Sequence, residues 1–125
     1  MTRTEASLVE AWRELADRHA RATTALERAL QDEHRLGVSE YEVLERLATP
    51  DKDLHRMQEL ADGVHLSQSA LSRVVARLEG DGLVTRSICA DDRRGIYACI
   101  TPAGRERYDA ARPTHRRVLS DVLGS

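Results

Sequence analysis

The sequence predicts a mainly α-helical domain in which a small β-hairpin follows a pair of short helices. Residues 5–33 contain no proline or glycine, and their apolar residues recur at alternating steps of four and three. Residues 57–78 contain two short amphipathic segments separated by a tight turn, and residues 83–100 contain two strand-like runs around a polar tip. With a second helix and a terminal helix, the predicted order is α-α-α-α-β-β-α.

The first predicted helix carries an apolar seam with heptad spacing. Such a seam is typical of a helix that packs against another long helix. A place in the core of the same chain is the alternative, and it stays open. The seam comprises Leu8, Trp12, Leu15, His19, Ala22, Leu26 and Ala29.

The next three helices are predicted from their caps and apolar faces. Ser39 and Glu42 have capping-box spacing, which predicts a helix over 39–48. Met57, Leu60, Ala61 and Val64 mark a third helix, and Ser67 caps a fourth after a turn at His65 and Leu66. Gly82 is expected to stop the fourth helix in a left-handed conformation. The buried stripe of the fourth helix is expected to be Leu71, Val74, Val75 and Leu78.

The hairpin and the terminal helix complete the domain. If Ile88 pairs with Ile96, Cys99 falls opposite Thr85, so no disulfide between Cys99 and Cys89 is expected. Thr101 caps the last helix with Pro102 at its first position, and this helix runs to about residue 123. Pro113 should kink it.

Two short helices joined by a tight turn and followed by a hairpin predict a winged helix-turn-helix, and the length and composition fit one such domain over residues 1–125. Apolar residues make up 41% of the chain and charged residues 32%. No apolar run is long enough to span a membrane and no signal peptide is recognised, so we expect a cytoplasmic protein without a membrane partner. Residues 65–107 contain seven arginines and five acids, so they carry +2 while the whole chain carries −2. A basic region on an acidic body suits nucleic acid. Lys52 is the only lysine of the chain, and genomic base composition explains this preference for arginine equally well.

The fourth helix has a compact polar face opposite its apolar stripe. Small hydroxyl groups allow a helix to approach base edges closely. Gln68 can pair with adenine and Arg73 with guanine, while the helix start at Ser67 suits a backbone phosphate. With Ser69, Ser72 and Arg77, these residues form the predicted DNA-binding face. An ordinary solvated helix face is the alternative reading.

Several segments together resemble the MarR family of bacterial regulators. They are Glu59-Leu60-Ala61, Leu66-Ser67-Gln68-Ser69-Ala70-Leu71-Ser72-Arg73-Val74-Val75, Leu78-Glu79, Gly82-Leu83-Val84-Thr85-Arg86, Asp91-Asp92-Arg93-Arg94 and Ile100-Thr101-Pro102-Ala103-Gly104-Arg105. The resemblance implies a homodimer on a pseudo-palindromic operator in double-stranded DNA. Residues 5–33 and 101–123 would dimerise, and residues 37–100 would form the DNA-binding lobe.

The resemblance also implies roles for the hairpin and for an effector. Arg94 of the hairpin would enter the minor groove, oriented by Asp92, and Arg93 and Arg86 would add to the DNA-binding set. A polar hairpin tip in solvent is the alternative. The family resemblance further implies a repressor released by a small, anionic aromatic effector. The candidate effector-binding residues are Trp12, His19 and Tyr41.

Other function classes fit the sequence less well. A winged-helix module that binds only proteins is the main alternative, and a salt titration of DNA binding would separate the two. We expect no enzyme and no cofactor, because the sequence shows no nucleophile–base set and no phosphate loop. No histidine pair has metal-ligand spacing, although folding could still gather the five histidines around zinc.

Overall fold

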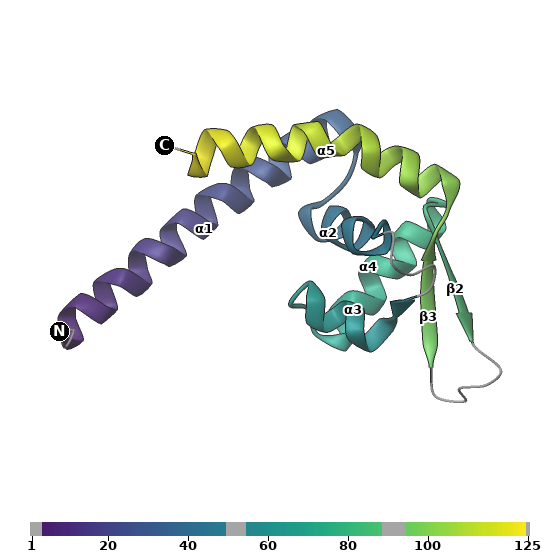
Figure 1. Ribbon diagram of the computed structural model, residues 1–125, viewed down its shortest axis with the longest axis horizontal. Coiled ribbons are helices and arrows are strands. Elements are labelled where there is room, and N and C mark those ends of the chain that lie inside the picture. The colour runs from purple at the N-terminus through teal and green to yellow at the C-terminus, as the bar shows by residue number, and fades with distance from the viewer. Residues whose placement is uncertain (1–3, 50–54, 89–94, 125) are drawn as a thin grey trace.

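The computed structural model describes residues 4–49, 55–88 and 95–124, and it confirms the predicted fold class. These residues form a mainly helical molecule with one small antiparallel sheet (Figure 1). The elements are α1 (Glu5–His34), α2 (Val38–Leu47), β1 (His55–Arg56), α3 (Met57–Gly63), α4 (Gln68–Gly80), β2 (Val84–Ile88), β3 (Ile96–Ile100) and α5 (Pro102–Leu123). Within this part of the chain, no helix is long and apolar enough to cross a membrane.

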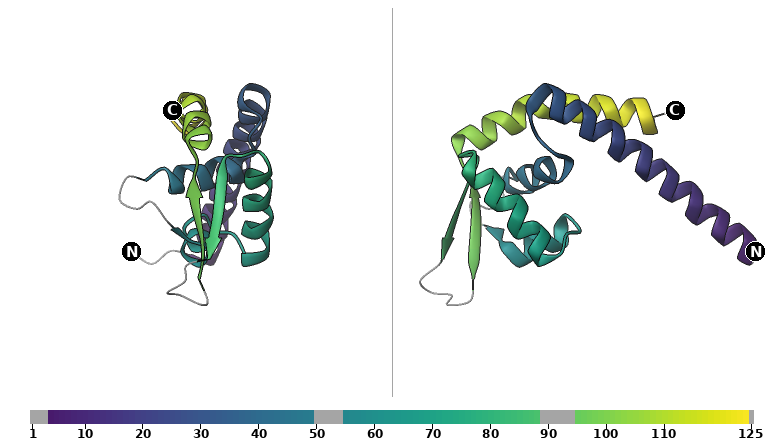
Figure 2. Two further views of the ribbon diagram at one scale, coloured as in Figure 1. Left: turned by 90° about the vertical axis from the view of Figure 1, so that its right-hand side faces the viewer. Right: turned by 180° about the vertical axis from the view of Figure 1, so that it is seen from behind.

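The helices divide into a compact lobe and a long helical pair. The helices α2, α3 and α4 pack with the sheet, and α5 lies across this lobe (Figure 1). The C-terminal part of α1 packs against α5, whereas its N-terminal half extends away from the lobe (Figure 2). A partner that binds α1 and α5 would therefore also determine the position of the lobe.

Only part of the predicted seam of α1 is packed within this chain. Ala22 and Leu26 are buried, together with Leu30, which the heptad reading omitted. In contrast, Leu8, Trp12 and Leu15 are 53%, 68% and 63% exposed. The C-terminal part of the seam thus belongs to the core of the chain, and the N-terminal part has no partner among the described residues.

The predicted capping box of the second helix is wrong by two residues. The helix begins at Val38 with Gly37 as its N-cap. A carboxylate oxygen of Glu40 accepts a hydrogen bond from the Gly37 amide at 3.1 Å, and Glu27 of α1 accepts one from the Val38 amide at 3.3 Å. Since these two carboxylates satisfy the first amides, the helix starts earlier than the sequence signal. Glu42 is consequently not a capping residue.

The turn between α3 and α4 forms as predicted, with His65 in a left-handed conformation at φ 58°. The Leu66 amide donates to the Ala61 carbonyl at 3.0 Å, which closes the end of α3. The Ser67 hydroxyl then accepts from the Ala70 amide at 3.1 Å and caps α4. The predicted left-handed Gly82 is also confirmed, with φ 76°.

The sheet has the strand order β1-β3-β2. Ile88 lies opposite Ile96 and Thr85 opposite Cys99, so the predicted register is confirmed. Cys99 is a free thiol, and Cys89 lies outside the described residues. The strand β1 was not predicted, because a strand of two residues is too short to show any alternation in the sequence.

Arginine side chains close the C-terminal ends of three helices. Arg107 donates to the His34 carbonyl at the end of α1 at 3.0 Å, and Arg46 donates to the Gly63 carbonyl at the end of α3 at the same distance. Arg105 donates to the Ala48 carbonyl after α2 at 3.4 Å. Positive charge is favourable at these ends, where helix carbonyls lack partners.

The helix α5, which is capped by Thr101 as predicted, runs unbroken through Pro113.

The first prediction concerns Gly104, where α5 approaches the start of β2. A Cβ atom at this position would overlap the carbonyl oxygen of Leu83 and lie 2.9 Å from a side-chain carbon of Ile100. Gly104→Ala should therefore lower the free energy of unfolding by about 1–3 kcal/mol in urea titrations. Gly80→Ala is the matched control, because nothing lies within 4 Å of its added Cβ. It should leave stability unchanged or raise it by up to about 1 kcal/mol, and equal losses in both variants would contradict the assignment.

The second prediction concerns the left-handed backbone of His65. A β-branched residue at this φ is strained, whereas glycine adopts it freely. His65→Val should thus be less stable than His65→Gly by about 1–2 kcal/mol, measured at one protein concentration. Equal stabilities for the two variants would show that the turn does not keep this conformation.

Candidate nucleic-acid interface

The helix α4 has two faces of opposite character. Leu71, Val75 and Leu78 are fully buried, which anchors one side of the helix in the lobe. The opposite side is open to solvent and carries the predicted DNA-binding residues. All of these side chains are exposed: Ser67, Gln68, Ser69, Ser72, Arg73 and Arg77. The structure therefore brings the predicted set together on one accessible face.

Arg73 and Arg77 differ in their surroundings. Arg73 makes no hydrogen bond or ion pair with any residue that the structure describes, so its guanidinium is available to a ligand. Arg77 is also exposed, but its guanidinium lies 3.8 Å from a carboxylate oxygen of Glu40. Glu40 is itself buried and fixed by the Gly37 amide. Sequence reasoning missed this carboxylate, because it is adjacent to α4 only in the folded chain.

Arg86 is tied to the end of α4. Its guanidinium donates twice to one oxygen of Glu79, at 3.2 and 3.0 Å. The pair joins β2 to α4 and partly neutralises the charge of Arg86. The hairpin strands extend away from α5 beside the lobe (Figure 1). Asp92, Arg93 and Arg94, which the sequence places at the hairpin tip, lie outside the described residues.

A cavity of about 630 Å³ lies between the helical pair and the lobe. It is bounded by α1, α2, the turn before α4, and α5. Of the three predicted effector-binding residues, only His19 lines it. Trp12 lies on the N-terminal part of α1, which extends away from the lobe. Tyr41 is fully buried and does not line the cavity. The polar lining residues are Arg18, His19, Thr23, Glu42, Glu45, Arg46, His65 and His115.

Tyr41 belongs to a stacked cluster that joins α2 to α5. Its ring stacks on His115 with 4.4 Å between centroids and on Tyr108 with 5.6 Å. The Tyr41 hydroxyl donates to Glu45 at 2.9 Å, and Arg116 donates to the same carboxylate oxygen at 3.0 Å. Burial, reinforced by the Glu45 carboxylate, raises the pKa of Tyr41 far above its ordinary value, so the hydroxyl stays protonated. The cluster therefore holds His115 and Glu45 in place, and these two residues line the cavity.

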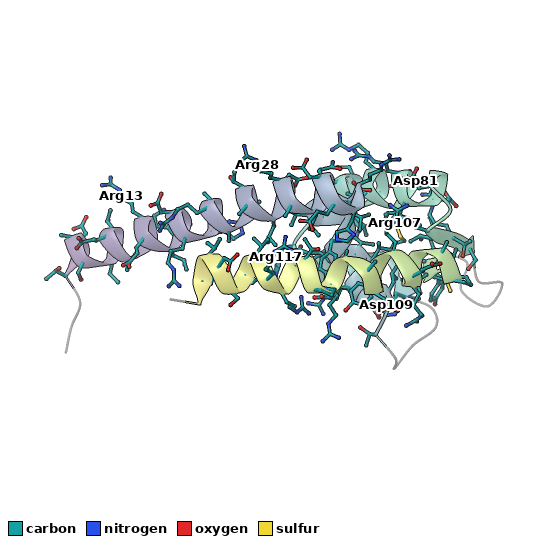
Figure 3. All side chains as sticks on the ribbon, turned by 90° about the horizontal axis from the view of Figure 1, so that it is seen from above. Arg13, Arg28, Asp81, Arg107, Asp109 and Arg117 are labelled. Carbon is teal, nitrogen blue, oxygen red and sulfur yellow. The ribbon has the colours of Figure 1, made fainter. Side chains whose placement is uncertain are left out.

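The helical pair is also fastened by polar contacts. His34 of α1 hydrogen bonds to Thr114 of α5 at 2.7 Å, and Arg117 forms an ion pair with Glu33 at 2.7 Å. Seen from above, α1 and α5 lie side by side, while Arg13 and Arg28 project from the edge of α1 that is turned away from α5 (Figure 3). Within residues 4–49, 55–88 and 95–124, no three potential metal ligands are grouped to hold an ion.

Comparison with known proteins identifies the fold and its family. A profile of the MarR family matches residues 36–96. The crystal structure of AbsC, a MarR family transcriptional regulator from Streptomyces coelicolor, is 32% identical, with a TM-score of 0.84 over 98% of this chain and 82% of that chain. Sco3205 from the same organism, a MarR family transcriptional regulator crystallised in complex with DNA, is 30% identical. Its structure superimposes with a TM-score of 0.87 and covers 98% of this chain and 77% of the Sco3205 chain.

A curated relative agrees with these structures. The Bacillus subtilis (strain 168) protein YkoM, described as an uncharacterized HTH-type transcriptional regulator, is 30% identical over 83 residues. The match covers 66% of this chain and 53% of YkoM, so it spans about half the length of that relative. The agreement of the profile, the curated relative and the near-complete structural matches shows that the chain belongs to the MarR family of transcriptional regulators.

Proposed function

We propose that this protein is a homodimeric, sequence-specific DNA-binding regulator that acts as a repressor on a pseudo-palindromic operator. The exposed face of α4 carries the proposal, because it presents small hydroxyls, an amide and the exposed guanidinium of Arg73 on a helix whose opposite side is buried in the lobe. Gln68 would read adenine and Arg73 guanine in the major groove, whereas Arg77 would contact phosphate. The DNA complex of Sco3205 supports DNA as the partner.

The proposed dimer follows from the free part of α1. Leu8, Val9, Trp12 and Leu15 are exposed on a helix that extends from the lobe without support (Figure 1). Burying such side chains is worth about 1.5–3 kcal/mol each, and a second copy would supply the missing surface. Residues 5–33 and 101–123 would then dimerise, leaving one lobe of residues 37–100 for each half of the operator.

A symmetric dimer would contain two copies of α4, the proposed recognition helix, each with the hairpin of its own chain beside it. Two α4 helices set about 34 Å apart would enter successive major grooves, with each hairpin over a flanking minor groove. Arg94 would enter that groove, Asp92 would orient it, and Arg93 would contact the backbone. Arg86 would serve mainly to hold the hairpin against α4 through Glu79.

We further propose that an effector in the cavity controls DNA binding. The cavity touches both the helical pair and the turn before α4, so a bound molecule can alter the spacing of the two recognition helices. By thermodynamic linkage, DNA would then weaken effector binding by the same factor. His19 remains the one sequence-predicted candidate that lines this cavity.

The dimer is tested by placing a charge in the apolar stripe of α1. Trp12→Glu should give a monomer in sedimentation experiments, because a buried carboxylate without a partner opposes association. Arg13→Glu introduces the same residue one position away and should remain dimeric. A stable dimer for Trp12→Glu at micromolar concentration would show that this stripe is not the interface.

Base reading is tested on operators first selected from random DNA. Arg73→Ala should weaken operator binding by about 1–3 kcal/mol and relax the preference at one base pair. Arg77→Ala should weaken all sequences alike and reduce the salt dependence by about one phosphate equivalent. Arg28→Ala, on α1, is the control and should change neither. An unchanged ratio of operator to random-DNA binding in Arg73→Ala would remove Arg73 from base reading, and salt-independent binding throughout would favour a protein-interaction module.

A further inference from the structure

We infer that the cavity between α1, α2 and α5 binds a small molecule that carries a protonated amine at one end and a hydrogen-bond acceptor at the other. Glu42 is the counter-ion of the amine, and His115 donates to the acceptor. The inference rests on the proposed function, because it names the chemical class of the effector.

The cavity has the size and the apolar body of a small-molecule site. Its volume of about 630 Å³ is in the range of pockets that enclose drug-sized ligands. Side chains from both the helical pair and the lobe supply its apolar surface. These are Leu15, Ala22, Leu26, Val38, Val64, Leu119 and Leu123. An apolar ligand body would therefore be enclosed between the dimerisation helices and the DNA-binding lobe.

Glu42 supplies a negative charge that the described protein leaves unpaired. The side chain is half-buried, and it has no hydrogen bond or ion pair with the residues described in the structure. Burial raises the pKa of Glu42, and the nearby carboxylate of Glu45 raises it further. Glu45, in contrast, is satisfied by Tyr41 and Arg116. A ligand ammonium would pair with the Glu42 carboxylate and offset the cost of burying its charge.

The basic side chains around Glu42 make no hydrogen bond or ion pair with it in the described part of the chain. His65 and His19 face it from the turn and from α1, and both favour its charged form. Arg46 also faces it, but its guanidinium is held by the Gly63 carbonyl. Arg18 lines the cavity from an exposed position on α1, where water already solvates its charge. The unmet demand inside the cavity is therefore for a cation, opposite in sign to the effector that the family resemblance implies.

His115 supplies the second, independent contact. Its side chain is 7% exposed and lines the cavity. Arg116 hydrogen bonds to its Nδ1, and a guanidinium can only donate, so Nδ1 must be the acceptor. Burial, with the charge of Arg116, lowers the pKa of His115 and keeps the ring neutral. The proton of the neutral ring then resides on Nε2, which has no protein partner in the described chain and can donate to a ligand oxygen.

The ligand would adjoin the element that positions the recognition helix. His65 lines the cavity with a left-handed backbone, two residues before the α4 cap Ser67. Occupation beside Glu42 changes the electrostatic environment of His65 directly. The recognition helix can therefore respond to the ligand without any contact between the ligand and α4.

Tyramine and 4-hydroxyphenylacetate are the matched probes. They share a phenol that can accept from His115, and they differ in carrying an ammonium or a carboxylate. In calorimetry with the full-length protein and no DNA, tyramine should bind at least about tenfold more tightly than the acid. Glu42→Gln should abolish this preference, whereas Glu14→Gln, an exposed change on α1, should retain it. Tighter binding of the acid, or no binding of tyramine up to about 10 mM, would overturn the inference.

A second measurement needs no ligand. Because the pKa of Glu42 is raised by folding, its contribution to stability is present below its unfolded-state pKa of about 4.3 and is lost as pH rises through the folded-state pKa. Glu42→Gln should therefore raise Tm at pH 7, and this gain should vanish near pH 4. A loss of Tm at pH 7 would show that Glu42 has a structural partner, and would overturn the inference. Since neither experiment contains DNA, a failure of operator binding would remain distinguishable from a failure here.

Discussion

Burial of the apolar side of α4 is the constraint on which the rest of the structure depends. Leu71, Val75 and Leu78 are sealed into the lobe, so α4 has only one rotational setting about its axis. That setting decides which side chains face solvent, and it leaves Arg73 exposed on the open face. The sheet, α2 and α3 pack around the same stripe. The accessibility of the proposed DNA-binding face is thus a consequence of core packing.

The arginines of this chain have divided tasks, which composition alone does not show. A net charge of +2 over residues 65–107 suggests a uniformly basic surface. In the folded chain, Arg105 and Arg107 instead cap α2 and α1, and Arg86 binds Glu79. These side chains stabilise the joints that orient the lobe. The proposed attraction for DNA would therefore depend on fewer arginines than the sequence count indicates.

Much of the fold could be predicted because local signals and packing agree. The caps of α4 and α5, the left-handed turn at His65 and the hairpin register each follow from a few neighbouring residues. The start of α2 could not be predicted, because its amides are satisfied partly by Glu27 from another helix. The strand β1 depends on pairing with distant β3, and the Glu40 carboxylate meets α4 only after folding. Likewise, heptad spacing predicted the apolar seam of α1, but it could not show which part of that seam belongs to the core of this chain.

Three positions depart from the local rules that otherwise agree with the fold. Trp12 leaves an apolar ring in solvent, Glu42 is half-buried without a hydrogen bond or ion pair among the described residues, and His65 holds a conformation that glycine adopts more easily. Each of these features costs stability in the isolated chain. In the proposed dimer a second copy would relieve the first cost, and a cationic ligand would relieve the second, while His65 lies two residues before the N-cap of α4. The proposed partner and the proposed ligand would then each remove a cost that the isolated chain retains.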